Sequence, residues 1–263
     1  MQTRLDEFVV AARKRPGDGG FLIDFDGTLS KIVDDPQIAV LVDGARQVLE
    51  ALASSYRVVV LVTGRRASWL SNLVGASQLR YLGLYGAEEL IGGEVIQAKS
   101  QTAGAERWRS SASRLARDAE ALVTTQGLVG CVVEFKDLAV SIHYRGAPDA
   151  GLRLIDWALT AAPRRGFEAS LGRMVVELKP KEVSKSNALR RVVAEQNLQW
   201  VVVAGDDQAD VEMMQAAREL LGNRSLCVGI ESAEEPTEMK NVADFRVGSP
   251  EQLVETLVLF EIA

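Results

Sequence analysis

Residues 20–29 read Gly-Phe-Leu-Ile-Asp-Phe-Asp-Gly-Thr-Leu, a short apolar run that ends in two aspartates and a glycine turn. An apolar run bounded by turn residues is typical of a strand that is buried on both faces of a sheet. In open α/β sheets the functional crevice lies beyond the carboxyl ends of the strands, which is where we expect Asp24 and Asp26. One carboxylate there can attack phosphorus while the other handles the proton of the leaving group. A strand followed by an ordinary Asp-Gly turn would need no chemistry, so this stretch alone leaves both interpretations open.

Similar apolar runs recur along the chain and alternate with helical periodicity. The runs that we predict to be strands are residues 57–64, 79–86 and 200–207. Apolar residues at helical spacing occur at positions 45–52, 67–74 and 188–193. This alternation predicts an α/β fold, a Rossmann-like core with a mostly parallel sheet flanked by helices.

The middle of the chain has a different order of elements. A charged helical segment (107–125) is followed by two strand-like runs, a second helix (149–162) and two more strand-like runs. This αββαββ order is antiparallel in character and interrupts the parallel pattern, so we predict an inserted α+β domain. The predicted boundaries give a core of residues 1–102 and 184–263 and an insert of residues 103–183.

Two further polar sites follow a predicted strand or begin a predicted helix. Thr63-Gly64-Arg65 ends the second run, where a hydroxyl and backbone N–H groups can bind a phosphate oxygen. Thr-Gly is equally a turn and a helix cap. Lys185 precedes a helix and can neutralise developing phosphoryl charge, although a solvated surface lysine looks the same in a sequence.

The fourth site is rich in carboxylates. Asp206, Asp207 and Asp210 follow the apolar run that begins at Trp200. Carboxylates this close repel one another at the end of a buried strand unless a cation is present, and Mg²⁺ takes oxygen ligands. A capping aspartate in an exposed loop would account for one of them but not for all three. The spacing therefore predicts a magnesium site.

The overall charge and the absence of targeting signals narrow the function classes. The formal net charge is −6, whereas nucleic-acid or anionic-membrane partners need a basic patch. No apolar run approaches the roughly 18 residues of a membrane-spanning helix, and the first twenty residues do not read as a secretory signal. We therefore expect a soluble, cytoplasmic protein that acts on a small molecule, with no nucleic acid, no membrane and no obligate protein partner. A phosphoesterase site built on several histidines does not fit a chain with one histidine.

In their order and spacing, the four sites resemble the motifs of the haloacid-dehalogenase-type phosphatases. More narrowly, the chain is similar to the trehalose-6-phosphate phosphatase family over residues 20–215. The stretches that carry this likeness are FLIDFDGTLSKIVDDP (21–36), LGLYGAEEL (82–90), VVEFKDLAVSIHYR (132–145), GRMVVELKP (172–180) and GDDQADVEMM (205–214). The resemblance implies a Mg²⁺-dependent sugar-phosphate phosphatase in which the insert is a substrate-specificity cap.

The resemblance also implies a role for each matched residue. Asp24 would be the nucleophile and a Mg²⁺ ligand, and Asp26 the general acid/base with its backbone carbonyl on the metal. Thr63 and Lys185 would hold the transferring phosphoryl group. The metal site would comprise Asp24, Asp26 and Asp206, with Asp207 and Asp210 adjoining. The residues expected to contact the substrate are Arg65, near the seam between core and insert, and Glu134, Lys136, Arg145 and Glu177, on the sugar hydroxyls.

By this resemblance the reaction is hydrolysis of trehalose 6-phosphate to trehalose and phosphate, through an aspartyl-phosphate intermediate. Tyr85, Ser186 and Ala209 lie near the crevice and depart from the family pattern, which leaves the exact substrate open. The alternatives are the phosphate of a related disaccharide or pseudo-disaccharide, or of a glycosylglycerol or glycosylglycerate. From another class, a non-catalytic sugar-phosphate sensor or synthase partner should have lost at least one motif residue, yet all are present.

Overall fold

The computed structural model describes residues 2–33, 38–91, 94–97, 102–172, 174–232 and 235–262. The chain divides into two compact units, which are Met1–Ile96 with Ser184–Ala263 (unit 1) and Gln97–Val183 (unit 2). The first boundary lies a few residues before the one expected from the sequence, and the second lies at the same place. No helix in the described part of the chain combines the length and the apolar character that crossing a bilayer requires.

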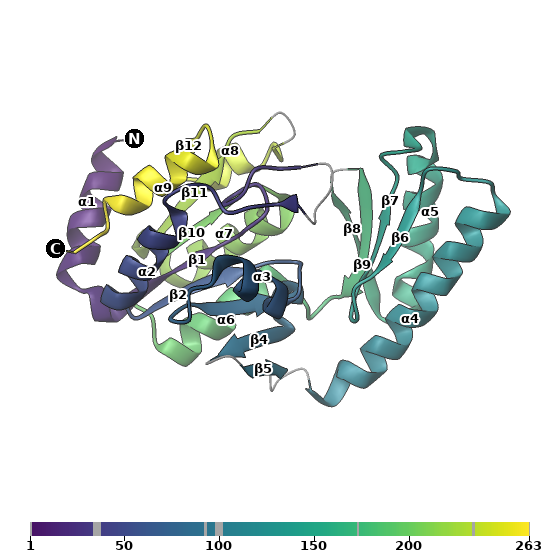
Figure 1. The fold of residues 1–263 in the computed structure, drawn as a ribbon, viewed down its shortest axis with the longest axis horizontal. Coiled ribbons are helices and arrows are strands. Elements are labelled where there is room, and N and C mark those ends of the chain that lie inside the picture. The colour runs from purple at the N-terminus through teal and green to yellow at the C-terminus, as the bar shows by residue number, and fades with distance from the viewer. Residues whose placement is uncertain are drawn as a thin grey trace. The chain divides into compact units, whose positions relative to one another are not determined.

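Unit 1 is built on one mixed sheet (Figure 1). Its described strands are β1 Gly19–Ile23, β2 Val58–Val62, β3 Arg80–Gly83, β4 Glu88–Ile91, β5 Glu94–Gln97, β10 Trp200–Gly205, β11 Ser225–Ile230 and β12 Phe245–Val247. They lie side by side in the order β12-β11-β10-β1-β2-β3-β4-β5. Neighbours from β12 to β3 are parallel, and β4 is antiparallel to β3. The sheet is therefore mostly parallel, as predicted.

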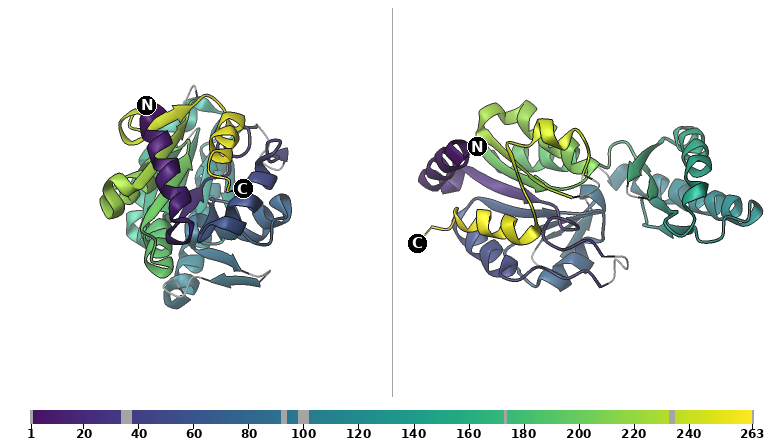
Figure 2. Two further views of the ribbon diagram at one scale, coloured as in Figure 1. Left: turned by 90° about the vertical axis from the view of Figure 1, so that its left-hand side faces the viewer. Right: turned by 90° about the horizontal axis from the view of Figure 1, so that it is seen from above.

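Helices cover both faces of this sheet (Figures 1 and 2). One layer consists of α1 Gln2–Lys14, α2 Ala45–Ser55, α3 Ala67–Val74 and α9 Pro250–Val258; the other consists of α6 Lys185–Gln196, α7 Gln208–Leu221 and α8 Met239–Val242. Successive β1 residues serve opposite layers, since Phe21 and Ile23 join the first apolar core and Leu22 the second. Because helices cover both faces of the sheet, β1 is apolar at every position. The predicted α/β core is confirmed.

One predicted strand ends early. The third apolar run is a strand only in its first half (β3) and then forms a 3₁₀ turn, Leu84–Gly86, in which Leu84 and Tyr85 have φ of 49° and 58°. A left-handed backbone conformation is uncommon for bulky residues, so it was not predicted for this apolar run. The amides of Leu84 and Tyr85 donate to the carbonyls of Arg65 (2.8 Å) and Thr63 (2.9 Å). This turn therefore stabilises the loop after β2 instead of continuing the strand. Other 3₁₀ turns are Pro16–Asp18, Pro148–Ala150, Pro163–Arg165 and Gly222–Arg224.

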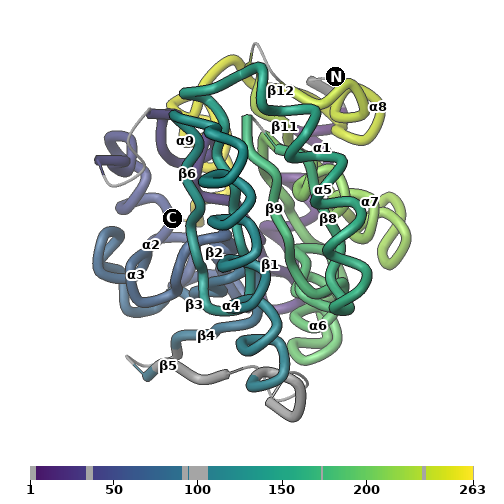
Figure 3. Tube along the Cα trace, turned by 90° about the vertical axis from the view of Figure 1, so that its right-hand side faces the viewer, coloured from purple at the N-terminus to yellow at the C-terminus, as the bar shows by residue number. Residues whose placement is uncertain are grey.

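Unit 2 has, within the described residues, a four-stranded antiparallel sheet and two helices (Figure 3). Its elements are α4 Thr102–Thr125, β6 Val132–Phe135, β7 Val140–His143, α5 Gly151–Ala161, β8 Phe167–Gly172 and β9 Val175–Pro180. The strand order is β6-β7-β9-β8. Leu115 of α4 and Leu154 of α5 pack with Ile142 and Leu178 of the sheet in a separate apolar core. The predicted αββαββ order is confirmed, although α4 begins earlier than expected.

Candidate active site

Three neighbouring parallel strands end at one edge of the unit 1 sheet and bring polar residues together. β1 lies in register between β10 and β2. Asp24, Thr63 and Asp206 each follow the last residue of one of these strands. The amide of Asp24 extends the ladder by donating to the carbonyl of Ala204 (3.0 Å). The sheet therefore fixes the spacing of the three side chains at its carboxyl edge.

The turn after β1 holds two carboxylates against each other. The hydroxyl of Thr28 donates to Asp24 Oδ2 (3.1 Å), and its oxygen also lies 3.4 Å from Asp206 Oδ1. Gly27 has φ of +79°, and a Cβ there would lie 2.2 Å from Asp206 Oδ2. Glycine is required on both grounds, because the left-handed conformation suits it and because the carboxylate occupies the space of a side chain. Thr28 was part of the quoted motif, but no feature of the sequence indicated that it contacts both carboxylates.

Lys185 begins α6 and points into the same cluster. The side chain of the N-cap residue Ser184 accepts from a backbone amide in the first turn, which fixes the start of the helix. Lys185 is 2% exposed, and its Nζ donates to Asp24 Oδ1 and Asp210 Oδ1, both at 2.8 Å. Burial alone would lower the pKa of Lys185, but the carboxylates of Asp207, Asp210 and Asp24 raise it well above its ordinary value. The ammonium is therefore charged.

Asp210 is fully buried and bonded through both oxygens. Its Oδ2 accepts from the amides of Asp206 (3.1 Å) and Asp207 (3.2 Å), and its Oδ1 accepts from Lys185. In return Asp207, the N-cap of α7, accepts from the amide of Asp210 (2.9 Å), which completes a capping box. A Cβ on Gly205 would lie 2.1 Å from the Asp210 carboxyl carbon. Asp210 thus ties the loop after β10 to Lys185.

The cluster holds more negative than positive charge. One oxygen from each of Asp24, Asp206 and Asp210 lies within 4.8 Å of the others, and all three residues are buried. Burial raises the pKa of Asp24 to about 6, although the ammonium of Lys185 acts in the opposite direction. Burial and then the neighbouring Asp24 raise the pKa of Asp206 well above its ordinary value. An all-oxygen donor set with excess negative charge fits a hard divalent cation such as Mg²⁺.

The Asp26 side chain is engaged elsewhere, by Arg65. Arg65 Nε donates to Asp26 Oδ2 (2.8 Å) and its Nη2 donates to Asp26 Oδ1 (2.5 Å). The carboxylates of Asp26 and Asp207 lie outside the group of three described above. The backbone carbonyl of Asp26 is the atom that the resemblance assigned to the metal, so its side chain is not needed there. The sequence did not indicate the pairing of Asp26 with Arg65.

Tyr85 and Glu88, which were not assigned to the site from the sequence, contact the Thr63–Arg65 loop and the start of α3 that follows it. Gly64 lies against the phenol of Tyr85, since a Cβ there would be 2.6 Å from the phenolic oxygen. Buried Glu88 accepts from the amide of Ala67 (3.3 Å) and from Arg66 Nη1 (3.1 Å), at the start of α3. Both residues lie in the stretch 82–90, which resembles the family, and Tyr85 was expected near the crevice, but the sequence indicated neither of these contacts.

A second polar cluster lies on the unit 2 sheet. Glu177 accepts from Lys136 Nζ (3.3 Å) and from the Ser141 hydroxyl (3.0 Å), and Glu134 Oε2 lies 3.7 Å from Lys136 Nζ. His143 Nε2 is 2.9 Å from Glu134 Oε2. Ser141 and His143 alternate along β7 with residues of the apolar core, and Glu134 of β6 and Glu177 of β9 are both paired with Ser141. These side chains therefore occupy the face of the sheet opposite the apolar core. The structure brings together Glu134, Lys136 and Glu177.

Two other unit 2 residues complete this account. Arg145, also predicted to contact the sugar, lies beyond the end of β7 and is exposed. Lys179, two residues after Glu177 on β9, was not singled out from the sequence and is only 2% exposed. A buried lysine on a polar sheet face has no signature in the sequence, because surface strands carry lysines at the same spacing.

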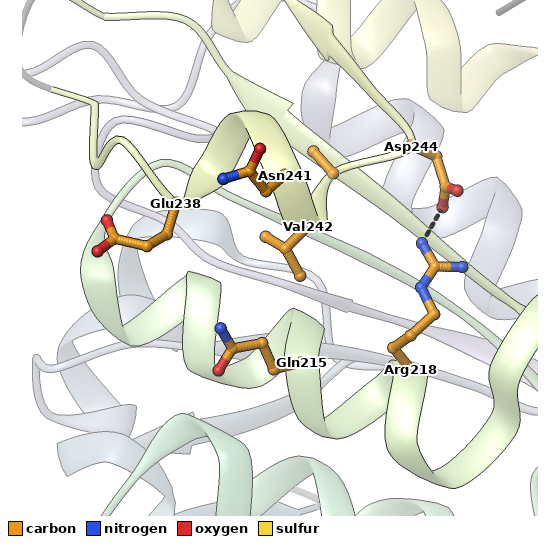
Figure 4. A pocket seen from close by; sticks show the side chains of 7 residues that line it. Gln215, Arg218, Glu238, Asn241, Val242 and Asp244 are labelled. Atoms are coloured by element: carbon orange, nitrogen blue, oxygen red, sulfur yellow. Dashed lines mark hydrogen bonds and ion pairs between the residues drawn. The ribbon is translucent and has the colours of Figure 1, made fainter.

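Unit 1 also has a surface hollow of about 450 Å³ beside α7 and α8 (Figure 4). The ion pair between Arg218 and Asp244 (2.8 Å) lies at one end of it, and Asp244 also accepts from the amide of Cys227 in β11 (2.8 Å). Its described lining includes no residue that the sequence predicted for the site. Its charged pair fastens α7 to β11.

Comparison with known proteins identifies the family. A sequence profile described as Trehalose-phosphatase matches residues 22–250. The chain belongs to the trehalose-phosphatase family. The resemblance seen in the motifs is therefore confirmed, and with it, at the level of the family, the prediction of a phosphatase-type hydrolase. Solved structures with a similar fold include a haloacid dehalogenase-like hydrolase from Bacteroides thetaiotaomicron (TM-score 0.60, 15% identity, covering 91% of this chain and 98% of that one).

Relatives of this trehalose-phosphatase family chain differ in length. It is 36% identical over 209 residues to an uncharacterized glycosyl hydrolase of Mycobacterium tuberculosis (strain CDC 1551 / Oshkosh), a match of 74% of this chain and only 15% of that protein. It is 27% identical over 231 residues to a probable trehalose-phosphate phosphatase of Sinorhizobium fredii (strain NBRC 101917 / NGR234), covering 85% and 83%. The fold resembles the C. albicans trehalose-6-phosphate phosphatase C-terminal domain, with TM-score 0.77, 22% identity and coverage of 98% and 97%.

Proposed function

We propose that the chain is a Mg²⁺-dependent phosphatase that hydrolyses trehalose 6-phosphate, with Asp24 as the nucleophile. The observation that carries the proposal is the buried Lys185 ammonium, which binds Asp24 and Asp210 beside Asp206 in a member of this family. A lysine in this place stabilises charge on a transferring phosphoryl group. The name of the Sinorhizobium fredii relative supports trehalose phosphate as the substrate.

In the proposed reaction, a carboxylate oxygen of Asp24 attacks phosphorus. A P–O bond to Asp24 forms while the bond from phosphorus to the sugar oxygen breaks, and Asp26 gives its proton to that oxygen. Water then attacks the phosphorus of the aspartyl-phosphate while Asp26 takes a proton from the water. The bond from phosphorus to Asp24 breaks, which regenerates the Asp24 carboxylate and releases inorganic phosphate. Thr28 and Lys185 orient the nucleophile through their hydrogen bonds to it. The Thr63 hydroxyl binds a phosphoryl oxygen.

For the metal, we assign Asp24 and Asp206 as side-chain ligands, with the backbone carbonyl of Asp26. The all-oxygen donor set and the uncompensated charge of the cluster support Mg²⁺. Asp207 and Asp210 adjoin the ion, and Asp210 also supports the loop after β10, since its Oδ2 accepts from the amides of Asp206 and Asp207. When bound, the ion neutralises charge on the phosphoryl oxygens.

For the sugar, we propose the polar residues of unit 2. Lysine and arginine donate to hydroxyl oxygens, and glutamate accepts from hydroxyl protons, so a mixed set suits a polyol. The residues concerned are Glu134, Lys136, Arg145 and Glu177. Under this proposal unit 2 is the substrate-specificity cap.

The test is phosphate release from a panel of sugar phosphates, with Mg²⁺ and after chelation. The panel comprises trehalose 6-phosphate, glucose 6-phosphate, a pseudo-disaccharide phosphate, a glycosylglycerol phosphate and a glycosylglycerate phosphate. We expect kcat/KM for trehalose 6-phosphate to exceed the others by about tenfold or more, since several hydroxyl contacts discriminate. Preference for another ester would overturn the substrate assignment. Binding of trehalose 6-phosphate without phosphate release, in the presence of Mg²⁺, would indicate a sensor.

A further inference from the structure

Arg65 is fixed on several sides in the loop after β2. Its guanidinium carbon lies 4.0 Å from the centre of the Trp69 ring and 5.8 Å from that of Phe25. Its amide donates to the Thr63 hydroxyl (3.1 Å), and its carbonyl accepts from the amide of Leu84 (2.8 Å). A planar guanidinium stacked on an aromatic ring presents its N–H groups along a fixed plane. The side chain is 18% exposed, so Arg65 presents its donors in one direction.

Those donors are directed at Asp26. Both carboxylate oxygens of Asp26 accept from Arg65, one from Nε and the other from Nη2. The Asp26 side chain is 44% exposed, so packing alone leaves several rotamers open to it. A bidentate arginine contact fixes both the position and the plane of a carboxylate.

We propose that Arg65 is a positioning residue for Asp26 and that Trp69 holds Arg65 in place. This inference rests on the proposed function, in which Asp26 protonates the leaving sugar oxygen. Proton transfer needs donor and acceptor within hydrogen-bond reach. Loss of Arg65 therefore spreads the Asp26 carboxyl group over several orientations and makes the productive one rarer.

This role differs from the substrate contact that the family resemblance implied for Arg65, and the two give different kinetics. An arginine on the phosphate helps every phosphate ester alike. An arginine that positions the proton donor helps only esters whose leaving oxygen needs a proton. A sugar alkoxide is strongly basic and needs one, whereas p-nitrophenolate leaves without one.

The experiment compares kcat/KM for trehalose 6-phosphate and p-nitrophenyl phosphate in the full chain with Mg²⁺. Because kcat/KM reports steps up to phosphoryl transfer, it excludes the later attack of water. We expect Arg65→Lys, which keeps the charge but not the bidentate contact, to lower the value for the sugar ester by about 30-fold or more and that for the aryl ester by about 3-fold or less. In an Asp26→Asn background, Arg65→Lys should cause no further loss, because the group that it positions is gone.

Two further variants provide a control and an alternative test. Arg190→Gln removes an exposed arginine of α6 that pairs with Glu219, and it should change neither ester. Trp69→Phe keeps Arg65 and places a smaller ring beneath it. It should also lower kcat/KM for the sugar ester more than that for the aryl ester, but by only about 3- to 5-fold. Trp69→Phe carries the test if melting curves show that Arg65→Lys does not fold.

Several outcomes would overturn the inference. Equal losses on both esters, or a further loss in the Asp26→Asn background, would make Arg65 a substrate contact. Unchanged values of kcat/KM in Arg65→Lys would exclude a role for Arg65 in the reaction. Failure of the proposed function looks different, because the unsubstituted chain would then release little or no phosphate from trehalose 6-phosphate.

Discussion

The two polar clusters of the chain differ in burial and in charge balance. In unit 1, the carboxylates of Asp24, Asp206 and Asp210 lie around the ammonium of Lys185. All four residues are less than a tenth exposed. Buried charges of one sign repel one another and lose hydration, so this cluster is stable only with further positive charge or with protons.

In unit 2 the charges are closer to balance. Lys136 lies between Glu177 and Glu134, and His143 pairs with Glu134, whose side chain is 50% exposed. Such a cluster needs no ion, and it offers both donors and acceptors to neutral hydroxyl groups. We therefore propose phosphoryl chemistry for the first cluster and sugar recognition for the second, and each cluster can be perturbed separately.

Asp24→Asn should have the largest effect, and it should fall on the first cluster alone. We expect kcat to drop by about 10⁴-fold or more, because an amide does not replace a carboxylate nucleophile. The fold should survive, since asparagine has nearly the same shape and removes one buried charge. Phosphate release and thermal melting measure the two quantities, with exposed Asp43→Asn as the control. Substantial hydrolysis by a well-folded Asp24→Asn would exclude Asp24 as the nucleophile.

Metal removal should have the next largest effect. Chelation should lower kcat by about 100-fold or more, because phosphoryl charge is then neutralised by Lys185 alone. Mg²⁺ at about 100 times its Kd should stabilise the folded chain by about 2.7 kcal/mol, which is several degrees of Tm. Asp206→Asn should lose most of this Tm shift.

Asp207→Asn is the matched control for the metal. Asp207 is half exposed and caps α7, and asparagine caps a helix about as well. We expect it to keep most of the Mg²⁺-dependent rise in Tm. Loss of the shift in Asp207→Asn would make this side chain a ligand, and an equal shift in Asp206→Asn would contradict the assigned site.

Residues at the ends of strands could be predicted from the sequence. Asp24, Thr63 and Asp206 follow apolar runs, and parallel strands bring their carboxyl ends to one edge, so the meeting of these residues follows from local pattern and sheet topology. Asp207 and Asp210 also have the spacing of a helix-capping box. The carboxylate-rich context favoured a metal instead, and the structure shows that the cap exists as well.

Contacts between side chains from distant segments could not be predicted. The pairing of Arg65 with Asp26, and the ring of Trp69 beneath it, depend on how the loops after β1 and β2 approach each other. The left-handed conformation of Leu84 and Tyr85 could not be predicted either, because bulky residues seldom adopt it. This conformation is stabilised by tertiary hydrogen bonds, which outweigh the local preference of an apolar run for a strand.

Glu177→Gln should have the smallest effect, and it should be confined to the second cluster. Glutamine keeps the shape of the side chain but removes the negative charge of the carboxylate, which pairs with Lys136 and accepts a hydrogen bond from Ser141. We expect KM for trehalose 6-phosphate to rise about tenfold with little change in kcat, the pattern of lost binding that is equal in ground and transition states. Hydrolysis of p-nitrophenyl phosphate, which has no sugar, should fall by about 2-fold or less.

The matched control for Glu177→Gln is Glu120→Gln, on an exposed position of α4. It removes one carboxylate from the same unit without touching the polar face of the sheet, and neither ester should respond. If Glu177→Gln slowed both esters equally, its effect would lie in the chemistry or the fold. If it changed neither, the polar face of unit 2 would not bind the sugar, and specificity would have to come from unit 1, where Tyr85 lies against Gly64.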